Sequence, residues 1–92
     1  MLSISVENLA TVVIIRLGGR FFFESADEIE EVWQNVLKGD PRIVAFDCAD
    51  LENVDSVALG IFVKLNNQAN ERHTRLVFFD INSGIEHLLT LS

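Results

Sequence analysis

The chain has 92 residues and a mass of 10.3 kDa, so residues 1–92 are expected to form one domain with a single modest core. Its 7 basic and 14 acidic side chains give a net charge of −7, which opposes binding to nucleic acid or anionic lipid, since both favour clustered Lys and Arg. Apolar residues make up 49% of the sequence, a share that excludes a disordered chain.

The apolar residues are not arranged as a membrane span or a secretory signal. The longest stretches without charge, residues 8–15 and 56–63, are far shorter than the roughly 20 residues that a spanning helix needs. The first basic residue is Arg16, and no small-residue cleavage site follows an apolar run. Cys48 is the only cysteine, which excludes an internal disulfide and a cysteine-based metal site. We therefore expect a cytoplasmic protein that does not insert into a membrane and has no metal or cofactor.

Two strand patterns open the chain. Residues 2–7 alternate between apolar and polar, the period of a half-buried strand. Residues 11–17 are dense in β-branched side chains, as in a strand covered on both faces. The residues between them are few enough for a hairpin, and Gly18-Gly19 is predicted to end the second strand. In the phenylalanine run at residues 21–23, we expect part to be core and one ring to be left outside for a partner.

The first helix is predicted over residues 25–38. Ser25 and Glu28 fit a capping box, in which each side chain satisfies a backbone N–H of the first turn. Gly39 and Pro41 are typical of a helix end. The apolar positions between these signals are spaced as one face of an amphipathic helix: Ile29, Val32, Trp33, Val36 and Leu37.

The remaining elements continue the alternation of strands and helices. Residues 42–48 and 75–81 are predicted strands, residues 49–54 a loop, and residues 56–70 and 83–91 helices. The order β-β-α-β-α-β-α predicts an α/β fold with a four-stranded mixed β-sheet and crossover helices, antiparallel only in its first hairpin. The second helix is expected to bury one side, formed by Val57, Ala58, Ile61, Phe62, Leu65 and Ala69.

The usual catalytic and metal-binding patterns are absent from the sequence. Neither a Gly-rich phosphate loop nor a Gly-x-Ser-x-Gly elbow occurs. His73 and His87 fall in or near different elements, and we interpret both as surface residues. Four acidic residues between 47 and 55 lack the spacing of an EF-hand. The sequence thus predicts a binding protein and not an enzyme.

The segment from Asp55 to Gly60 carries the functional signal. Asp55 and Ser56 are both good N-cap residues, so the plainest interpretation is the start of a helix. Ala58 and Gly60 then leave little side chain near Ser56, and glycine weakens a helix by about 1 kcal/mol relative to alanine. A small-residue surface around a hydroxyl at the positive end of a helix is suited to docking a partner or accepting a phosphate.

With this segment in place, residues 4–91 resemble the STAS domain of anti-sigma factor antagonists. The family motif is Asp-Ser-Ser/Thr-Gly-φ-Gly, where φ is apolar, and residues 55–60 read Asp-Ser-Val-Ala-Leu-Gly. The resemblance implies that a cognate anti-sigma factor kinase phosphorylates Ser56 and that a phosphatase reverses this. The unmodified form would bind the kinase and free its sigma factor, a partner switch in bacterial transcription control. The implied partner-binding residues are Asp55, Ser56, Val57, Ala58 and Gly60.

Three departures from the family pattern keep other interpretations open. Val57 replaces a hydroxyl residue, Ala58 replaces a glycine, and phenylalanines occupy the neighbourhood where the family often has an aspartate. One alternative is a STAS subunit of a membrane lipid-transport ABC complex, in which Ser56 need not be phosphorylated. The other is a small serine hydrolase with Ser56 as nucleophile, for which the glycines of the elbow are missing. A homodimer is compatible with the sequence.

Overall fold

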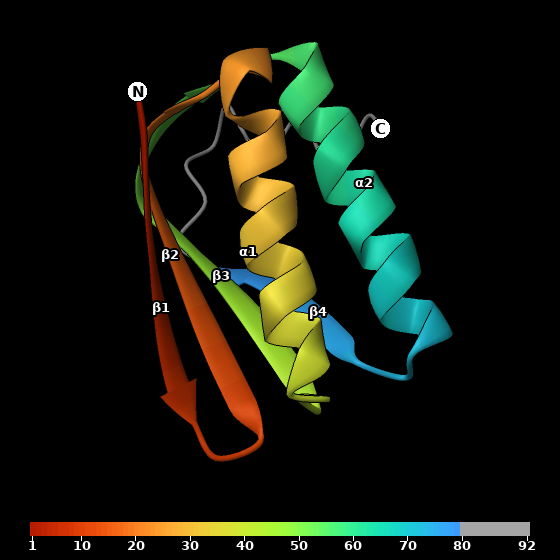
Figure 1. Cartoon of the computed structure of the whole chain (residues 1–92). Helices are drawn as coiled ribbons and strands as arrows, with labels where there is room; N and C mark the ends of the chain where they lie inside the picture. Colours follow the sequence, from red (N-terminus) through yellow and green to blue (C-terminus); the bar gives the residue numbers. More distant parts are fainter. Residues whose placement is uncertain (80–92) are drawn as a thin grey trace.

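The computed structural model describes residues 1–79, which form a four-stranded mixed sheet with two α-helices (Figure 1). The elements in chain order are β1 (Leu2–Leu9), β2 (Val12–Phe21), the short 3-10 helix η1 (Phe23–Ser25), α1 (Ala26–Lys38), β3 (Ile43–Val54), α2 (Ser56–Glu71) and β4 (Arg75–Phe79). The predicted helix over residues 83–91 lies outside the described residues. Within them, neither helix is long and apolar enough to cross a membrane.

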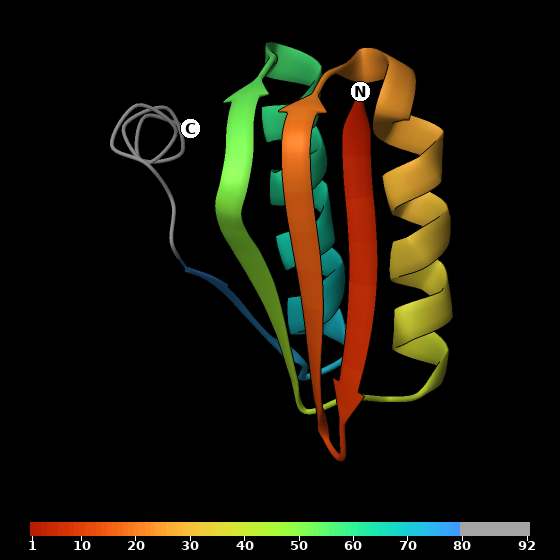
Figure 2. The ribbon, with the colours of Figure 1, turned by 90° about the vertical axis from the view of Figure 1, so that its left-hand side faces the viewer.

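The strands lie in the order β1-β2-β3-β4, with β1 antiparallel to β2 and the other pairs parallel. Two crossovers that step in the same direction across a parallel sheet place their helices on the same face. Figure 2 shows this arrangement, with the strands in front and α1 and α2 behind them. The α/β fold and the hairpin predicted from the sequence are confirmed.

The predicted ends of two strands are wrong. Strand β2 continues through Gly18 and Gly19 to Phe21, and β3 continues through residues 49–54, where a loop was expected. The two extensions pair with each other, with register shifts on either side of the glycines. Gly19 has a φ of +82°, which only glycine adopts without strain. Backbone pairing with the end of β2 therefore holds residues 49–54 in strand geometry.

Helix α1 has the predicted amphipathic face but not the predicted cap. Ile29, Trp33, Val36 and Leu37 are buried. Ser25 makes no capping hydrogen bond with its side chain, because η1 leads directly into α1 and leaves Ser25 at a ψ of 3° instead of the extended geometry of an N-cap. The capping-box prediction is therefore wrong, whereas the predicted end at Gly39 is confirmed.

An aromatic cluster fills the core between the sheet and the helices. Trp33 is fully buried and stacks on Phe46 at a centroid distance of 6.1 Å, while its Nε1–H donates to Gln68 Oε1 at 2.9 Å. Phe62 packs edge-on against Phe46 at 5.8 Å. Val57, in contrast, is 47% exposed and does not belong to the buried side of α2, which is a correction. It lies about 100° around the helix axis from Ala58, at the border of that side.

Candidate functional site

The candidate site lies where the chain passes from β3 into α2. Asp55 is the N-cap of α2, in extended geometry with φ −102° and ψ 179°, and its Oδ1 accepts a hydrogen bond from the backbone N–H of Ala58 at 2.8 Å. Ser56 is consequently the first residue of the helix and not its cap. Among residues 1–79, no group hydrogen bonds to the Ser56 hydroxyl, and the residue is exposed. The hydroxyl is therefore available to a reagent or partner from outside.

The second oxygen of Asp55 links this helix to a distant segment. Its Oδ2 accepts from the backbone N–H of Phe23 at 2.9 Å, across 32 positions of sequence. The backbone N–H of Asp55 also donates to the carbonyl of Phe21 at 3.3 Å. Figure 1 shows the result, in which η1 lies beside the start of α2. One carboxylate thus fixes both the helix start and the turn after β2, a role that the sequence analysis missed.

The surface around the hydroxyl is small and apolar. We define the Ser56 surface as four exposed residues on these two segments: Phe23, Ser56, Val57 and Gly60. Phe23 is 63% exposed and Val57 47% exposed. A Cβ added at Gly60 would meet no atom of the described residues within 4 Å, so packing within residues 1–79 does not require glycine there. Glycine at this position agrees with the expectation that Gly60 leaves room for another molecule.

Among the predicted partner-binding residues, Ala58 is buried and Asp55 makes structural hydrogen bonds. Ala58 is fully buried, so its side chain cannot contact a partner, and its place on the predicted surface is a correction. The carboxylate of Asp55 accepts hydrogen bonds from two backbone N–H groups and so holds together the segments that carry the Ser56 surface. Phe23 was missed as a specific residue, although the phenylalanine run predicted that one ring would be exposed. That ring belongs to Phe23, whereas Phe21 is fully buried.

The electrostatics of the site come from one helix end and several carboxylates. Helix α2 has no acidic residue in its first turn, and the carboxylate of its N-cap, Asp55, lies next to its positive end. Glu24 follows Phe23, and Asp27 and Glu28 lie in the first turn of α1. An anion added at Ser56 would meet the favourable helix end and, at longer range, these negative charges.

The geometry offers little to catalysis or to a metal. Among residues 1–79, no group of three His, Cys, Asp or Glu could hold a metal ion. Asp47 instead accepts from the backbone N–H of Ala49 at 3.0 Å and faces Arg16 at 3.6 Å. His73 follows the far end of α2, a helix of 16 residues and thus about 24 Å long. His73 therefore cannot act as a base for the Ser56 hydroxyl, and His87 lies outside the described residues.

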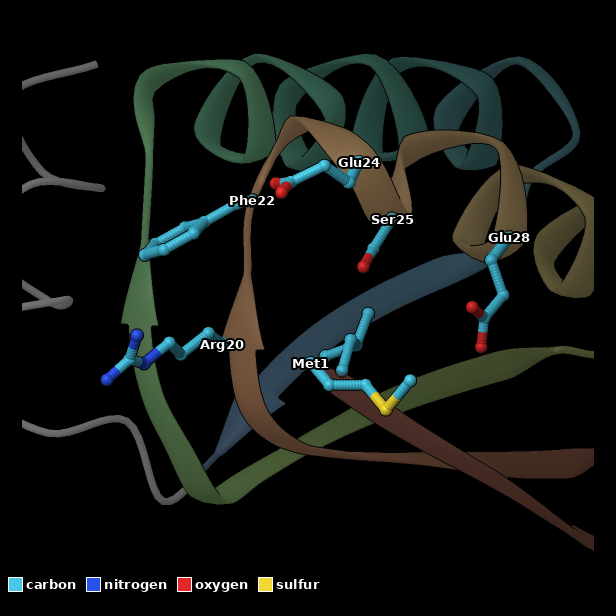
Figure 3. Close-up of a pocket in the computed structure, with 7 residues that line it drawn as sticks. Met1, Arg20, Phe22, Glu24, Ser25 and Glu28 are labelled. Carbon is cyan, nitrogen blue, oxygen red and sulfur yellow. The ribbon is translucent and has the colours of Figure 1, made fainter.

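A hollow of about 670 Å³ adjoins the site without including Ser56. It lies between the start of β1, the end of β2 and the start of α1, as Figure 3 shows. In that view Arg20 and Phe22 extend on one side, with Ser25 and Glu28 on the other. Its lining residues are Met1, Leu2, Arg20, Phe22, Glu24, Ser25 and Glu28. The hollow shares the turn after β2 with the Ser56 surface, but no residue of α2 is among its lining residues.

The match to a known family decides what kind of domain this is. A family model described as the STAS domain matches residues 3–92. The chain belongs to the STAS domain family. No curated protein matches the sequence. The predicted order of strands and helices is confirmed through β4, and in the structure the Asp55–Gly60 segment lies at the start of α2.

Solved structures share the fold at low sequence identity. An anti-sigma factor antagonist from Mycobacterium paratuberculosis has a TM-score of 0.80 and 19% identity, with 99% of this chain and 80% of that chain covered. The anti-sigma factor antagonist SpoIIAA in its unphosphorylated form has a TM-score of 0.81 and 14% identity over 98% and 84%. The phosphorylated form of Bacillus SpoIIAA has the same TM-score, with 14% identity over 97% and 82%.

The same fold also occurs in other proteins. A sulfate transporter family protein from Wolinella succinogenes has a TM-score of 0.78 and 19% identity, over 92% of this chain and 69% of that chain. The chain spans only 20% of the length of a further structure, that of Mglu, at a TM-score of 0.77 and 19% identity. The fold of this chain is therefore shared by anti-sigma factor antagonists and by a sulfate transporter family protein.

Proposed function

We propose that this STAS domain is an anti-sigma factor antagonist, a protein-binding module that phosphorylation of Ser56 controls. In its unmodified form it binds a serine kinase of the anti-sigma factor class, and in its phosphorylated form it releases that kinase. The observation that carries the proposal is the exposed Ser56 hydroxyl, first in α2 and without a hydrogen-bond partner among residues 1–79. Asp55 already caps the helix, so a modification of Ser56 removes no structural contact.

The unmodified surface suits a close apolar contact. Phe23 and Val57 offer exposed apolar side chains on either side of a short polar hydroxyl. Gly60 lies one turn further along α2 and leaves space above the helix. Because Asp55 fixes Phe23 to the start of α2, the surface loses little conformational entropy when a partner binds. Exposed aromatic residues held in this way commonly contribute much of the binding energy of an interface.

A phosphate at Ser56 changes this contact without requiring a new fold. It adds about −1.5 to −2 charge and three acceptor oxygens. The positive end of α2 stabilises that charge, so the domain stays folded. A partner that buries Phe23 and Val57 would have to desolvate the phosphate next to Asp55, which costs several kcal/mol. Equal similarity of the chain to both forms of SpoIIAA agrees with a switch that does not reshape the domain.

The test uses an anti-sigma factor kinase encoded in the same genome, incubated with the domain, Mg²⁺ and ATP. Mass spectrometry should find one phosphate on Ser56 and none on the Ser56→Ala variant. Thr11→Ala is the matched control, since Thr11 is also an exposed hydroxyl residue but lies in the hairpin at the opposite end of the molecule (Figure 1). Phosphate on another residue, or none on wild type, contradicts the proposal.

A second candidate is a constitutive STAS subunit of a membrane transport complex. The observation in its favour is Val57, whose exposed apolar side chain stands where the family motif has a second hydroxyl residue. Such a surface binds its partner permanently, and a negative charge at Ser56 is then never part of its function. The domain, tested with the ATPase of a transport complex from the same genome, would bind that ATPase and not the kinase.

A further inference from the structure

The edge of the sheet formed by β1 is a second surface, separate from the Ser56 site. Strand β1 pairs with β2 over all 8 of its residues without a register shift. Among residues 1–79, no strand pairs with its other side, since β1 is the first strand in the sheet order. Five of its residues are exposed, including Val6 at 42% and Leu9 at 47%. The outer edge of β1 is therefore unpaired among the described residues, and it is open from Ser3 onward, whereas Leu2 is buried at 5% exposure.

Strand β1 lacks the features that keep an edge strand from pairing. Natural edge strands are usually interrupted by proline, a bulge or lysine. This strand has no proline, no lysine and no bulge, and its only charge is Glu7. That charge is not free, because Glu7 Oε1 lies 2.8 Å from Arg16 Nη1 on the neighbouring strand. A straight, nearly neutral strand with open hydrogen-bonding groups selects another strand as its partner.

We propose that β1 pairs antiparallel with β1 of a second copy of this chain, joining two four-stranded sheets into one. A strand that pairs with itself about a two-fold axis needs no partner other than its own copy. The sequence of β1 is self-complementary in the register centred on Ser5. In that register Ile4 of each copy lies opposite Val6 of the other copy, on the face that carries the helices. Each Glu7 lies opposite Ser3, so like charges do not meet.

The dimer leaves the proposed switch accessible. No residue of the Ser56 surface belongs to β1, so the strand pairing itself covers none of that surface. Pairing covers Val6, which is otherwise an exposed apolar residue, and satisfies backbone groups on the outer side of β1. The proposal therefore does not depend on whether Ser56 is phosphorylated.

Sedimentation equilibrium of the full 92-residue chain tests the dimer. At about 200 µM, wild type should have a mass near 20 kDa, twice the 10.3 kDa of one chain. Val6→Lys should weaken the dimer at least about tenfold, because a charge then faces Ile4 of the second copy. Val63→Lys is the matched control, since Val63 is 43% exposed on α2 and the change in charge is the same. It should leave the dimer unchanged.

A charge exchange at the two-fold axis tests the register. Ser5→Glu and Ser5→Lys should each be monomeric, because Ser5 faces itself and like charges then oppose each other. An equimolar mixture should recover the dimer, since opposite charges now meet. Hydrogen exchange should show protected β1 amides in the wild-type dimer and faster exchange in Val6→Lys, with the α1 amides unchanged. A monomer at about 200 µM, equal effects of Val6→Lys and Val63→Lys, or a mixture that stays monomeric would each overturn the proposal.

Discussion

Asp55 accepts the two hydrogen bonds that build the site, and its substitutions measure how much each bond contributes to stability. Its Oδ1 accepts from Ala58 N–H at 2.8 Å and its Oδ2 from Phe23 N–H at 2.9 Å. Loss of a helix N-cap costs about 1 kcal/mol, and loss of one further hydrogen bond at a partly exposed site costs about 1 kcal/mol. Asp55→Ala should therefore lower the free energy of unfolding by about 2 kcal/mol.

Two milder variants divide that cost. Asp55→Asn keeps an oxygen for Ala58 but places an amide nitrogen against the N–H of Phe23. Asp55→Ser keeps a short capping oxygen that does not reach Phe23. Each should cost about 1 kcal/mol, half the effect of Asp55→Ala, because each retains the cap and loses the link. The order of the three variants thus reports whether one carboxylate serves both segments.

Urea unfolding followed by the fluorescence of Trp33, the only tryptophan, gives these free energies. Hydrogen exchange adds the assignment to single amides. The Phe23 amide should exchange faster in all three variants, whereas the Ala58 amide should do so only in Asp55→Ala. A cost below about 0.5 kcal/mol for Asp55→Ala, or a Phe23 amide whose protection does not change, would refute the role given to Asp55.

Substitutions at three further positions test the core and the turn, each by urea unfolding followed by circular dichroism, because the Trp33 variants lose the fluorescent probe. Trp33→Ala should cost about 3–5 kcal/mol, because the fully buried ring packs against the sheet, while Trp33→Phe should cost about 1 kcal/mol through loss of the bond to Gln68. Gly19→Ala should cost about 1–3 kcal/mol, since φ is +82° and the new Cβ would lie 2.3 Å from the carbonyl oxygen of Met1. Cys48→Ala should cost about 1 kcal/mol, because Cys48 is 2% exposed. It should retain partner binding, because Cys48 does not belong to the Ser56 surface. A loss of binding in a folded Cys48→Ala would reveal a missed role for the thiol.

The parts of the fold that could be predicted depend on the spacing of residues that are close together in the sequence. The face of α1 follows from apolar residues at helical intervals, and its end follows from Gly39. The hairpin and the parallel strands follow from the order of the elements. Burial of Trp33 was predicted by its place in the helical stripe, although its hydrogen bond to Gln68, 35 positions away, was not.

What the sequence did not predict depends on pairing between distant segments. Residues 49–54, with Asp50, Glu52 and Asn53, resemble a loop, but they form a strand because the end of β2 supplies hydrogen-bonding partners. The Ser25 cap was predicted from a local motif that η1 displaces. At the site, the position of Ser56 was predicted, whereas the link from Asp55 to Phe23 was not, since nothing in the spacing brings these residues together. The one local signal for this link was the phenylalanine run at residues 21–23, which predicted an exposed ring.

The central claim is that phosphate on Ser56 controls binding, and its most direct test is a pair of dissociation constants. Isothermal titration calorimetry of the anti-sigma factor kinase from the same genome should compare the unmodified domain with one phosphorylated at Ser56, as verified by mass spectrometry. Thr11→Glu provides a control for added negative charge away from the site. The account predicts that phosphate weakens binding at least about 100-fold, and that Thr11→Glu does not change it. Equal affinity of the phosphorylated and unmodified domains would contradict the claim and favour a constitutive subunit.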